Sequence, residues 1–333
     1  MPTDSAAGVW ELLRYVREFI QHPRRLDPLI NNKPGWYMLT SAMDIVSDTE
    51  SAIASYEKGD WQDKGTLYLV IFGLLQAMYL QQDALRSMVH ALEGNADYKI
   101  DSEPEAMSIR QIRHDTVGHP TKQGGTNAKG NGAFTEQTSH SIVQHSMRKQ
   151  YYTLLRSSNL ADTTFVDINT FELIEKNRAL AIRILARTKA NLERIEMEHR
   201  AAFKGEKLAS IFHPTMHYQF EKVFEGIYNP DYGRGPYGQL SLQTIVGYFN
   251  DFKAALEKRG ILNGSGHLHF NLDETEYALN ELTNYYNGTG MLTDKQAAEI
   301  FRYFAERKMD ELKRIAEEID AEYEEKFTGA SGE

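Results

Sequence analysis

One short segment concentrates the residue types that could do chemistry. The stretch SIRQIRHDTVGHPTK covers residues 108–122 and contains Arg110, Arg113, His114, Asp115 and His119. The two arginines supply guanidinium groups that suit phosphate oxygens, and the two histidines titrate near neutral pH. Asp115 could orient a histidine. A histidine that removes a proton and an arginine that stabilises an anionic phosphate together could cleave RNA through its own 2′-hydroxyl without a metal.

The spacing of these residues sets a geometric condition. On an unbroken helix the six positions from Arg113 to His119 turn the side chain through about 600°, so the two point to different faces. They converge only if the helix breaks near Gly118 or if two copies of the segment meet across a dimer axis. Arg110 and His114, four positions apart, share a face. The alternative is that these cations only cap the end of a helix, where positive charge is favourable.

The same segment resembles the motif of the HEPN superfamily. That motif is an arginine, a polar residue, a few further residues and a histidine, matched here by Arg113, His114 and His119. The apolar run at 67–85 resembles the helix that precedes the motif in that family. The resemblance covers about residues 35–200, and implies a bundle of four or five helices that usually dimerises and a metal-independent endoribonuclease of toxin–antitoxin, phage-defence or RNA-processing systems.

The resemblance also implies roles for individual residues. Arg113 and His119 would be the catalytic pair, and His114 would take the assisting polar position. Arg110 and Asp115 are added only because they lie nearby in the sequence. Some members of the family are inactive binding or scaffold modules, and that remains the alternative reading.

Three other segments contain candidate residues, and for each we favour a structural reading. His213, His217 and Glu221 are spaced four apart, as in some zinc sites, but the glutamate of an HExxH motif is missing. The others are His267 and His269, which alternate as on a strand in a glycine-rich loop, and the loop 229–238, whose Tyr232 or Tyr237 could stack a base. His140 and His145 in the strand-rich segment could approach Arg113, but nothing in the sequence shows this. We therefore expect no metal and no cofactor.

Composition narrows the class of protein. The chain has 333 residues, a net charge of −10 and no cysteine, which excludes disulfides, thiolate zinc sites and a thiol nucleophile. We expect a cytoplasmic protein, because the N-terminus lacks the order of a signal peptide and no apolar run is long enough to span a bilayer. The acidic charge argues against attraction of nucleic acid over the whole surface.

The spacing of apolar residues and the positions of residues that begin or end helices predict a mainly α-helical fold. A small antiparallel β-meander is expected near 140–168, where β-branched and aromatic residues alternate, and 23–34 and 121–139 are expected to be irregular. In 37–57, Met43, Val46 and Ile53 are candidate core positions, and Asn169 or Thr170 caps the helix that follows the meander. The expected helices are 9–22, 37–57, 64–93, 104–117, 169–203, 210–228, 241–258, 273–286 and 293–325.

These observations predict a domain organisation and a function. Residues 1–205 would form a HEPN-like helical domain with the β insertion, residues 206–328 a second helical domain, and residues 329–333 a disordered tail. The predicted function is metal-independent RNA cleavage by a homodimer, with RNA as substrate and an antitoxin or regulatory protein as a possible partner.

Overall fold

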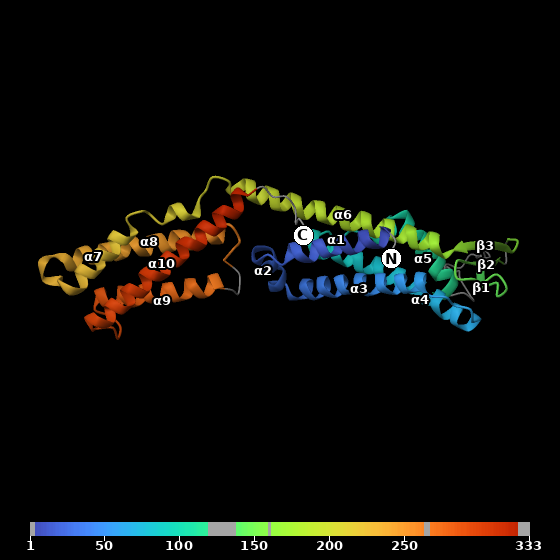
Figure 1. The fold of residues 1–333 in the computed structure, drawn as a ribbon, viewed down its shortest axis with the longest axis horizontal. Helices are drawn as coiled ribbons and strands as arrows, with labels where there is room; N and C mark the ends of the chain where they lie inside the picture. The colour runs from blue at the N-terminus through green and yellow to red at the C-terminus, as the bar shows by residue number, and fades with distance from the viewer. Residues whose placement is uncertain (1–3, 119–137, 159–160, 263–266, 326–333) are drawn as a thin grey trace, which may run out of the picture. The chain divides into compact units, whose positions relative to one another are not determined.

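The computed structural model describes residues 4–118, 138–158, 161–262 and 267–325 (Figure 1). Within these ranges the chain is mainly helical and contains a three-stranded antiparallel sheet, which confirms the predicted fold class at that level. No helix in these ranges combines the length and apolar character of a membrane span. The chain divides into two compact units: Met1–Ile20 with Ile30–Glu193 form unit 1, and Gln21–Leu29 with Arg194–Glu333 form unit 2.

Unit 1 is a helical bundle with the sheet at one end of it (Figure 1). The three strands of its sheet follow one another in chain order, and the middle strand is antiparallel to both neighbours. Its elements are α1 (Asp4–Ile20), α3 (Lys33–Lys58), α4 (Lys64–Glu93), α5 (Pro104–Arg113), β1 (Thr138–Ile142), β2 (Tyr151–Ser158), β3 (Thr164–Asn169) and most of α6 (Thr170–Phe203).

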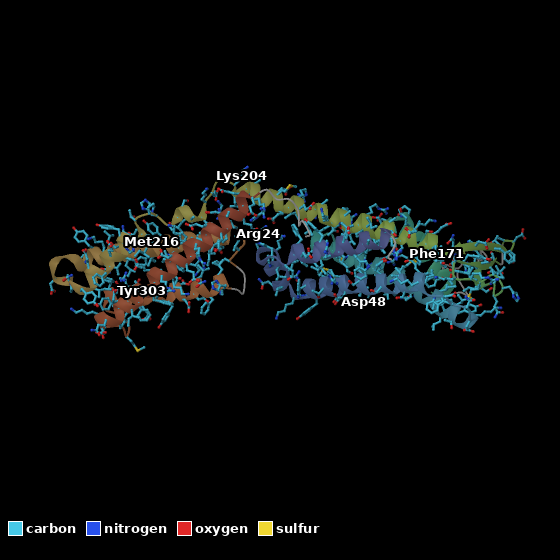
Figure 2. The ribbon with its side chains drawn as sticks, in the orientation of Figure 1. Arg24, Asp48, Phe171, Lys204, Met216 and Tyr303 are labelled. Atoms are coloured by element: carbon cyan, nitrogen blue, oxygen red, sulfur yellow. The ribbon has the colours of Figure 1, made fainter. Side chains whose placement is uncertain are left out.

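The core of unit 1 joins the bundle to the sheet. Met43, Val46 and Ile53 of α3 are buried, as their spacing predicted, whereas Asp48 on the same helix is exposed (Figure 2). One face of β2 carries Tyr152 and Leu154 into the same apolar cluster as residues of α4 and α6. Alternation along the strand explains this burial, since every second side chain faces the core.

The junction between the sheet and α6 is capped as the sequence predicted. The side-chain oxygen of Asn169 accepts hydrogen bonds from the backbone N–H groups of Phe171 (3.0 Å) and Glu172 (3.2 Å). The Asn169 amide in turn donates to the Glu172 carboxylate at 3.2 Å. These bonds satisfy donors that the first turn of a helix leaves unpaired, so the cap fixes where α6 begins.

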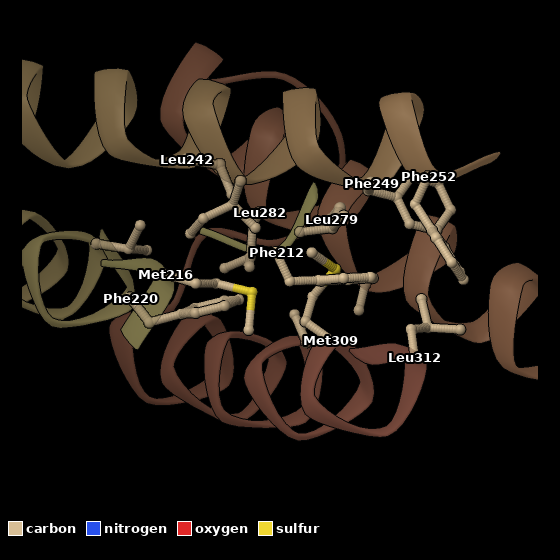
Figure 3. Packing of buried hydrophobic residues seen from close by; sticks show 14 of the residues in the cluster. Phe212, Met216, Phe220, Leu242, Phe249, Phe252, Leu279, Leu282, Met309 and Leu312 are labelled. Atoms are coloured by element: carbon tan, nitrogen blue, oxygen red, sulfur yellow. The ribbon is translucent and has the colours of Figure 1, made fainter. Parts of the chain in front are cut away.

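Unit 2 is a second helical bundle with its own core. Aromatic and aliphatic side chains from these helices pack together in one buried cluster, which includes Phe212, Phe220, Phe249 and Phe252 (Figure 3). Its elements are α2 (Pro23–Asn31), the end of α6, α7 (Met216–Tyr228), α8 (Arg234–Lys258), α9 (His267–Asn287) and α10 (Lys295–Glu324).

The sequence-based expectation of an irregular stretch at 23–34 is wrong. Residues Pro23–Asn31 form α2, and α3 already begins at Lys33. Pro23 occupies the first helical position, where a missing N–H costs nothing. Two arginines of α2, Arg24 and Arg25, form ion pairs with the buried Glu196 of α6. Local sequence could not show these contacts, because they join residues far apart in the chain.

Several helix starts in unit 2 also differ from expectation. The helix expected from 210 begins at Met216, after a short 3₁₀ turn at Leu208–Ile211. Two others start earlier than expected, since α8 begins at Arg234 and α9 at His267. The sequence did not show these two helix starts because glycines precede the expected starts, and glycine is more typical of turns than of helices. Residues 121–137 of the expected loop lie outside the described residues. The predicted tail, 329–333, also lies outside them.

Candidate functional site

The arginine and histidine segment lies at the end of α5, where the helix changes form. Pro104 begins α5, and the buried Ala106 and Ile109 pack it into unit 1. After Arg113 the backbone continues as a single π-helical turn, His114–Gly118. Such turns are rare and are frequent at functional sites. A break near Gly118 is one of the two conditions under which Arg113 and His119 could converge, the other being a dimer, and the helix changes to this π turn at that place.

The π turn brings the side chains of Arg113 and His114 together over Gly118. A π turn pairs residues five apart, which places Gly118 on the same line as Arg113. A Cβ atom added at Gly118 would lie 3.2 Å from Nη1 of Arg113 and 3.4 Å from Cδ2 of His114. The absence of a side chain at Gly118 therefore lets the guanidinium and the imidazole converge directly before His119. His119 itself lies outside the described residues.

Arg113 is held by neutral groups. Its Nε and Nη2 donate to the amide oxygen of Gln76 at 3.2 and 2.9 Å. Its guanidinium carbon lies 4.9 Å from the centre of the Tyr79 ring. In the described part of the chain no carboxylate forms an ion pair with Arg113. The guanidinium is thus fixed in position, and no carboxylate of the described residues compensates its positive charge.

Arg110 has different surroundings. Its Nη2 donates to Asp83 at 2.6 Å, and its Nε lies 3.3 Å from a carboxylate oxygen of Asp101. The same Nε donates to Gln82 at 3.0 Å. Arg110 also stacks on Tyr79, with its guanidinium carbon 4.3 Å from the ring centre. Two carboxylates neutralise this arginine, so its evident effect is to fasten α5 to α4.

Asp115 lies between two histidines. One of its oxygens accepts a hydrogen bond from Gln111 at 2.6 Å and lies 3.7 Å from Nδ1 of His114. The other oxygen lies 3.6 Å from Nε2 of His140 on β1. Both histidine distances exceed a normal hydrogen bond, so the carboxylate acts on the two rings mainly through its charge. Neither contact is a hydrogen bond that would orient a histidine ring.

His140, one of the two histidines of the strand-rich segment that could approach Arg113, lies beside Asp115. Its side chain is buried, and neither ring nitrogen has a hydrogen-bond partner in the described ranges. Burial lowers the pKa of His140; the Asp115 carboxylate opposes this, while the positive charges of Arg156 and His114 reinforce it. Burying a polar ring without a hydrogen bond costs free energy of folding. Among the described residues, the Asp115 carboxylate is the acidic group that lies within ion-pair distance of the His140 ring, at 3.6 Å. His145, the other histidine of the segment, is exposed.

The sheet fixes the π turn through a buried contact. The hydroxyl groups of Thr116 and Tyr152 lie 3.0 Å apart, and both residues are buried. Burial raises the pKa of Tyr152, so this phenol stays protonated at neutral pH. The contact joins the middle of the π turn to the central strand β2, and β1, which carries His140, pairs with that strand.

The remaining candidates do not form sites in the described part of the chain. His217 pairs with Glu306 at 2.6 Å and lies 3.7 Å from Glu221, while His213 contacts Thr215 before α7 begins. The expectation that His267 and His269 alternate as on a strand is wrong, because both lie on α9. Tyr237 lies on α8 rather than in a loop. No group of three or more potential metal ligands occurs among the described residues.

Comparison with known proteins gives no family. Neither a family model, nor a curated protein, nor a solved structure matches this chain.

Proposed function

We propose that this protein is a metal-independent endoribonuclease of the HEPN type. The observation that supports this most is the π turn, which sets the guanidinium of Arg113 and the imidazole of His114 together over Gly118, the residue that precedes His119 in the sequence. The uncompensated charge of Arg113 gives further support, because it is held by Gln76 and Tyr79 without a carboxylate partner in the described ranges.

The reaction we propose uses the RNA 2′-hydroxyl as nucleophile. His119 takes the proton from this hydroxyl as the oxygen attacks the adjacent phosphorus. Arg113 stabilises the added charge on the pentacoordinate phosphate, and His114 assists by orientation or proton transfer. The P–O5′ bond breaks, and a proton is delivered to the leaving 5′ oxygen. The products are a 2′,3′-cyclic phosphate and a 5′-hydroxyl.

The proposal includes the cellular context that the resemblance implies. A second copy of the chain would form a homodimer and bring two copies of the segment together. RNA would be the substrate in the cytoplasm, and an antitoxin or regulatory protein would restrain the enzyme. The protein would act as part of a defence or toxin system.

A catalytically inactive scaffold is the second candidate. The contacts of Arg110 and Arg113 with Gln76, Tyr79 and Asp83 of α4 support it, because they hold α5 in the bundle whether or not RNA is cleaved. In that case the arginines would matter for stability, and the surface of the unit would bind a partner.

Incubation of labelled total RNA in EDTA tests the two candidates together. Wild type would be compared with Arg113→Ala and His119→Ala, and with His145→Ala as the matched control, because His145 is an exposed histidine outside the candidate site. We expect wild type and the control to leave 2′,3′-cyclic phosphate ends, and the other two variants to lose at least about 10²-fold in rate.

The thermal unfolding of each variant separates loss of chemistry from loss of structure. Unchanged unfolding temperatures with lost cleavage would support the enzyme. Full cleavage by both site variants would overturn the residue assignment. Failure of folded wild type to cleave, with lower unfolding temperatures in the arginine variant, would favour the scaffold.

A further inference from the structure

Unit 2 contains a cavity between α8 and α9 that none of the preceding functions uses. Its volume is about 330 Å³, at the lower end of the range for small-molecule pockets. Gln239 of α8 donates a hydrogen bond of 3.0 Å to Asn287 of α9, so an amide pair joins the two helices where they line the cavity. None of the residues that line it carries a charge.

One stripe of α8 forms a wall of this cavity. Gln243, Val246, Gly247 and Asn250 are spaced as i, i+3, i+4 and i+7, which places them on one face of the helix. The two amide residues are separated by two turns, or about 10 Å along the axis. Both amides are exposed, and neither has a hydrogen-bond partner in the described part of the chain, so both can bond a ligand that enters from solvent.

Gly247 is the residue that most clearly points to a ligand. Glycine within a helix is less favourable than alanine. An added Cβ at Gly247 would have nothing within 4 Å, so packing does not require a glycine there. The contrast is Gly238 on the same helix, whose Cβ would lie 2.4 Å from the Tyr286 hydroxyl and 3.0 Å from the Cα of Gly226. Gly238 is needed for helix packing, whereas Gly247 leaves open space in the cavity wall.

The functional groups that line the cavity indicate which class of ligand it could bind. Carboxamides carry both donors and acceptors, and they match the edge of adenine in a bidentate manner. Val246 and Gly247, between the two amides, offer a low apolar surface on which a flat ring can lie. The lack of charge in the lining disfavours phosphorylated ligands, since no cation would compensate them.

We propose that unit 2 binds an uncharged purine nucleoside in this cavity. The base lies over Gly247, and Gln243 and Asn250 bond to its opposite edges. This site belongs to unit 2 and the α5 segment to unit 1, and the site does not depend on RNA cleavage, so either proposal can fail alone.

Isothermal titration of the full chain with adenosine, guanosine, cytidine and uridine tests the site. We expect a purine nucleoside to bind, and AMP to bind no more tightly than adenosine. Gly247→Leu fills the cavity and should weaken binding at least tenfold. Gly73→Leu is the matched control, because Gly73 is also a helical glycine whose Cβ position is open, but it belongs to α4 in unit 1.

Three results would overturn the proposal. They are the absence of purine nucleoside binding to folded wild type at millimolar concentration, tighter binding of AMP than of adenosine, and unchanged binding in a folded Gly247→Leu variant. Asn250→Ala provides a second variant that leaves the backbone untouched, and it should also weaken binding. Binding of glucose in place of nucleosides would show that the amides serve a carbohydrate instead.

Discussion

Arg178 and Glu50 form an ion pair in unit 1 in which neither side chain has any exposed surface, with Nε of the arginine 2.8 Å from Oε1 of the glutamate. The same guanidinium donates to both oxygens of Glu57, at 2.9 and 2.7 Å. Burial raises the pKa of Glu50, and the charge of Arg178 opposes that rise. The arginine therefore compensates the fully buried Glu50 and also Glu57, and its Nη1 lies 3.7 Å from a third carboxylate, that of Glu175.

We expect Arg178→Met to destabilise unit 1 by about 3–5 kcal/mol, because it leaves a buried carboxylate without its partner. Urea unfolding measures this change. The control is Arg194→Met, which breaks an exposed pair with Glu198 and should cost less than about 1 kcal/mol. Adding Glu50→Gln to the Arg178→Met variant should restore part of the loss. Equal stability of Arg178→Met and wild type would contradict this account of the core.

Gly118→Ala should slow RNA cleavage roughly tenfold or more if the proposed function is right, because small displacements of reacting groups have large effects on rate. The new Cβ would press on Arg113 at 3.2 Å and on His114 at 3.4 Å. Single-turnover cleavage in EDTA is the measurement. Gly73→Ala is the control, since nothing lies within 4 Å of its Cβ position. Cleavage by Gly118→Ala at the wild-type rate would show that the π turn does not set the active geometry.

His199 in unit 2 should make stability depend on pH. Burial lowers its pKa to about 4, with the positive charges of Arg24, Arg259 and Arg200 acting in the same direction and Glu196 opposing them. The unfolded chain, in which the pKa is about 6.5, binds the proton first. Stability is therefore fully present above about pH 6.5 and declines as the pH falls towards 4, where this contribution levels off.

Hydrogen exchange of α10 and the end of α6 across this pH range measures that decline. His199→Gln should flatten it, because glutamine does not titrate. His269→Gln, a change at an exposed histidine of α9, should leave it unchanged. An identical pH profile for wild type and His199→Gln would refute the assignment.

The cap of α6 should contribute measurably to stability. Asn169→Ala removes the acceptor for two backbone N–H groups and should cost about 1 kcal/mol in urea unfolding. Asn169→Asp keeps an acceptor and should retain most of the wild-type stability. If alanine and aspartate behaved alike, the hydrogen bonds would not be the source of the effect.

The helices that the sequence predicted best are those that local signals define at both ends. The expected helix 64–93 matches α4, because Asp63 caps its first turn and Gly94 ends it with a left-handed φ of 63°. The sheet was predicted from alternation alone. α2 could not be predicted, because its polar, proline-containing sequence gains its support from Glu196, far away in the chain.

The candidate site likewise has features that the local sequence predicted and features that only tertiary contacts decided. The spacing of Arg113 and His119 showed that a regular helix would separate them, so that they could meet only through a break near Gly118 or across a dimer axis. The sequence did not show that Asp115 lies between His114 and His140, or that carboxylates neutralise Arg110 but not Arg113 within the described ranges. Those facts depend on how the sheet and α4 pack around the π turn.

The sequence alone thus determined the helical class, the small antiparallel sheet, the cap of α6 and the segment that gathers arginine and histidine. Each of these follows from neighbouring residues, through side-chain periodicity, capping and turn chemistry. Only the tertiary structure decided which charges are compensated and which histidine joins Asp115. Those outcomes are set by contacts between distant segments, such as Thr116 with Tyr152, whose geometry no local pattern records.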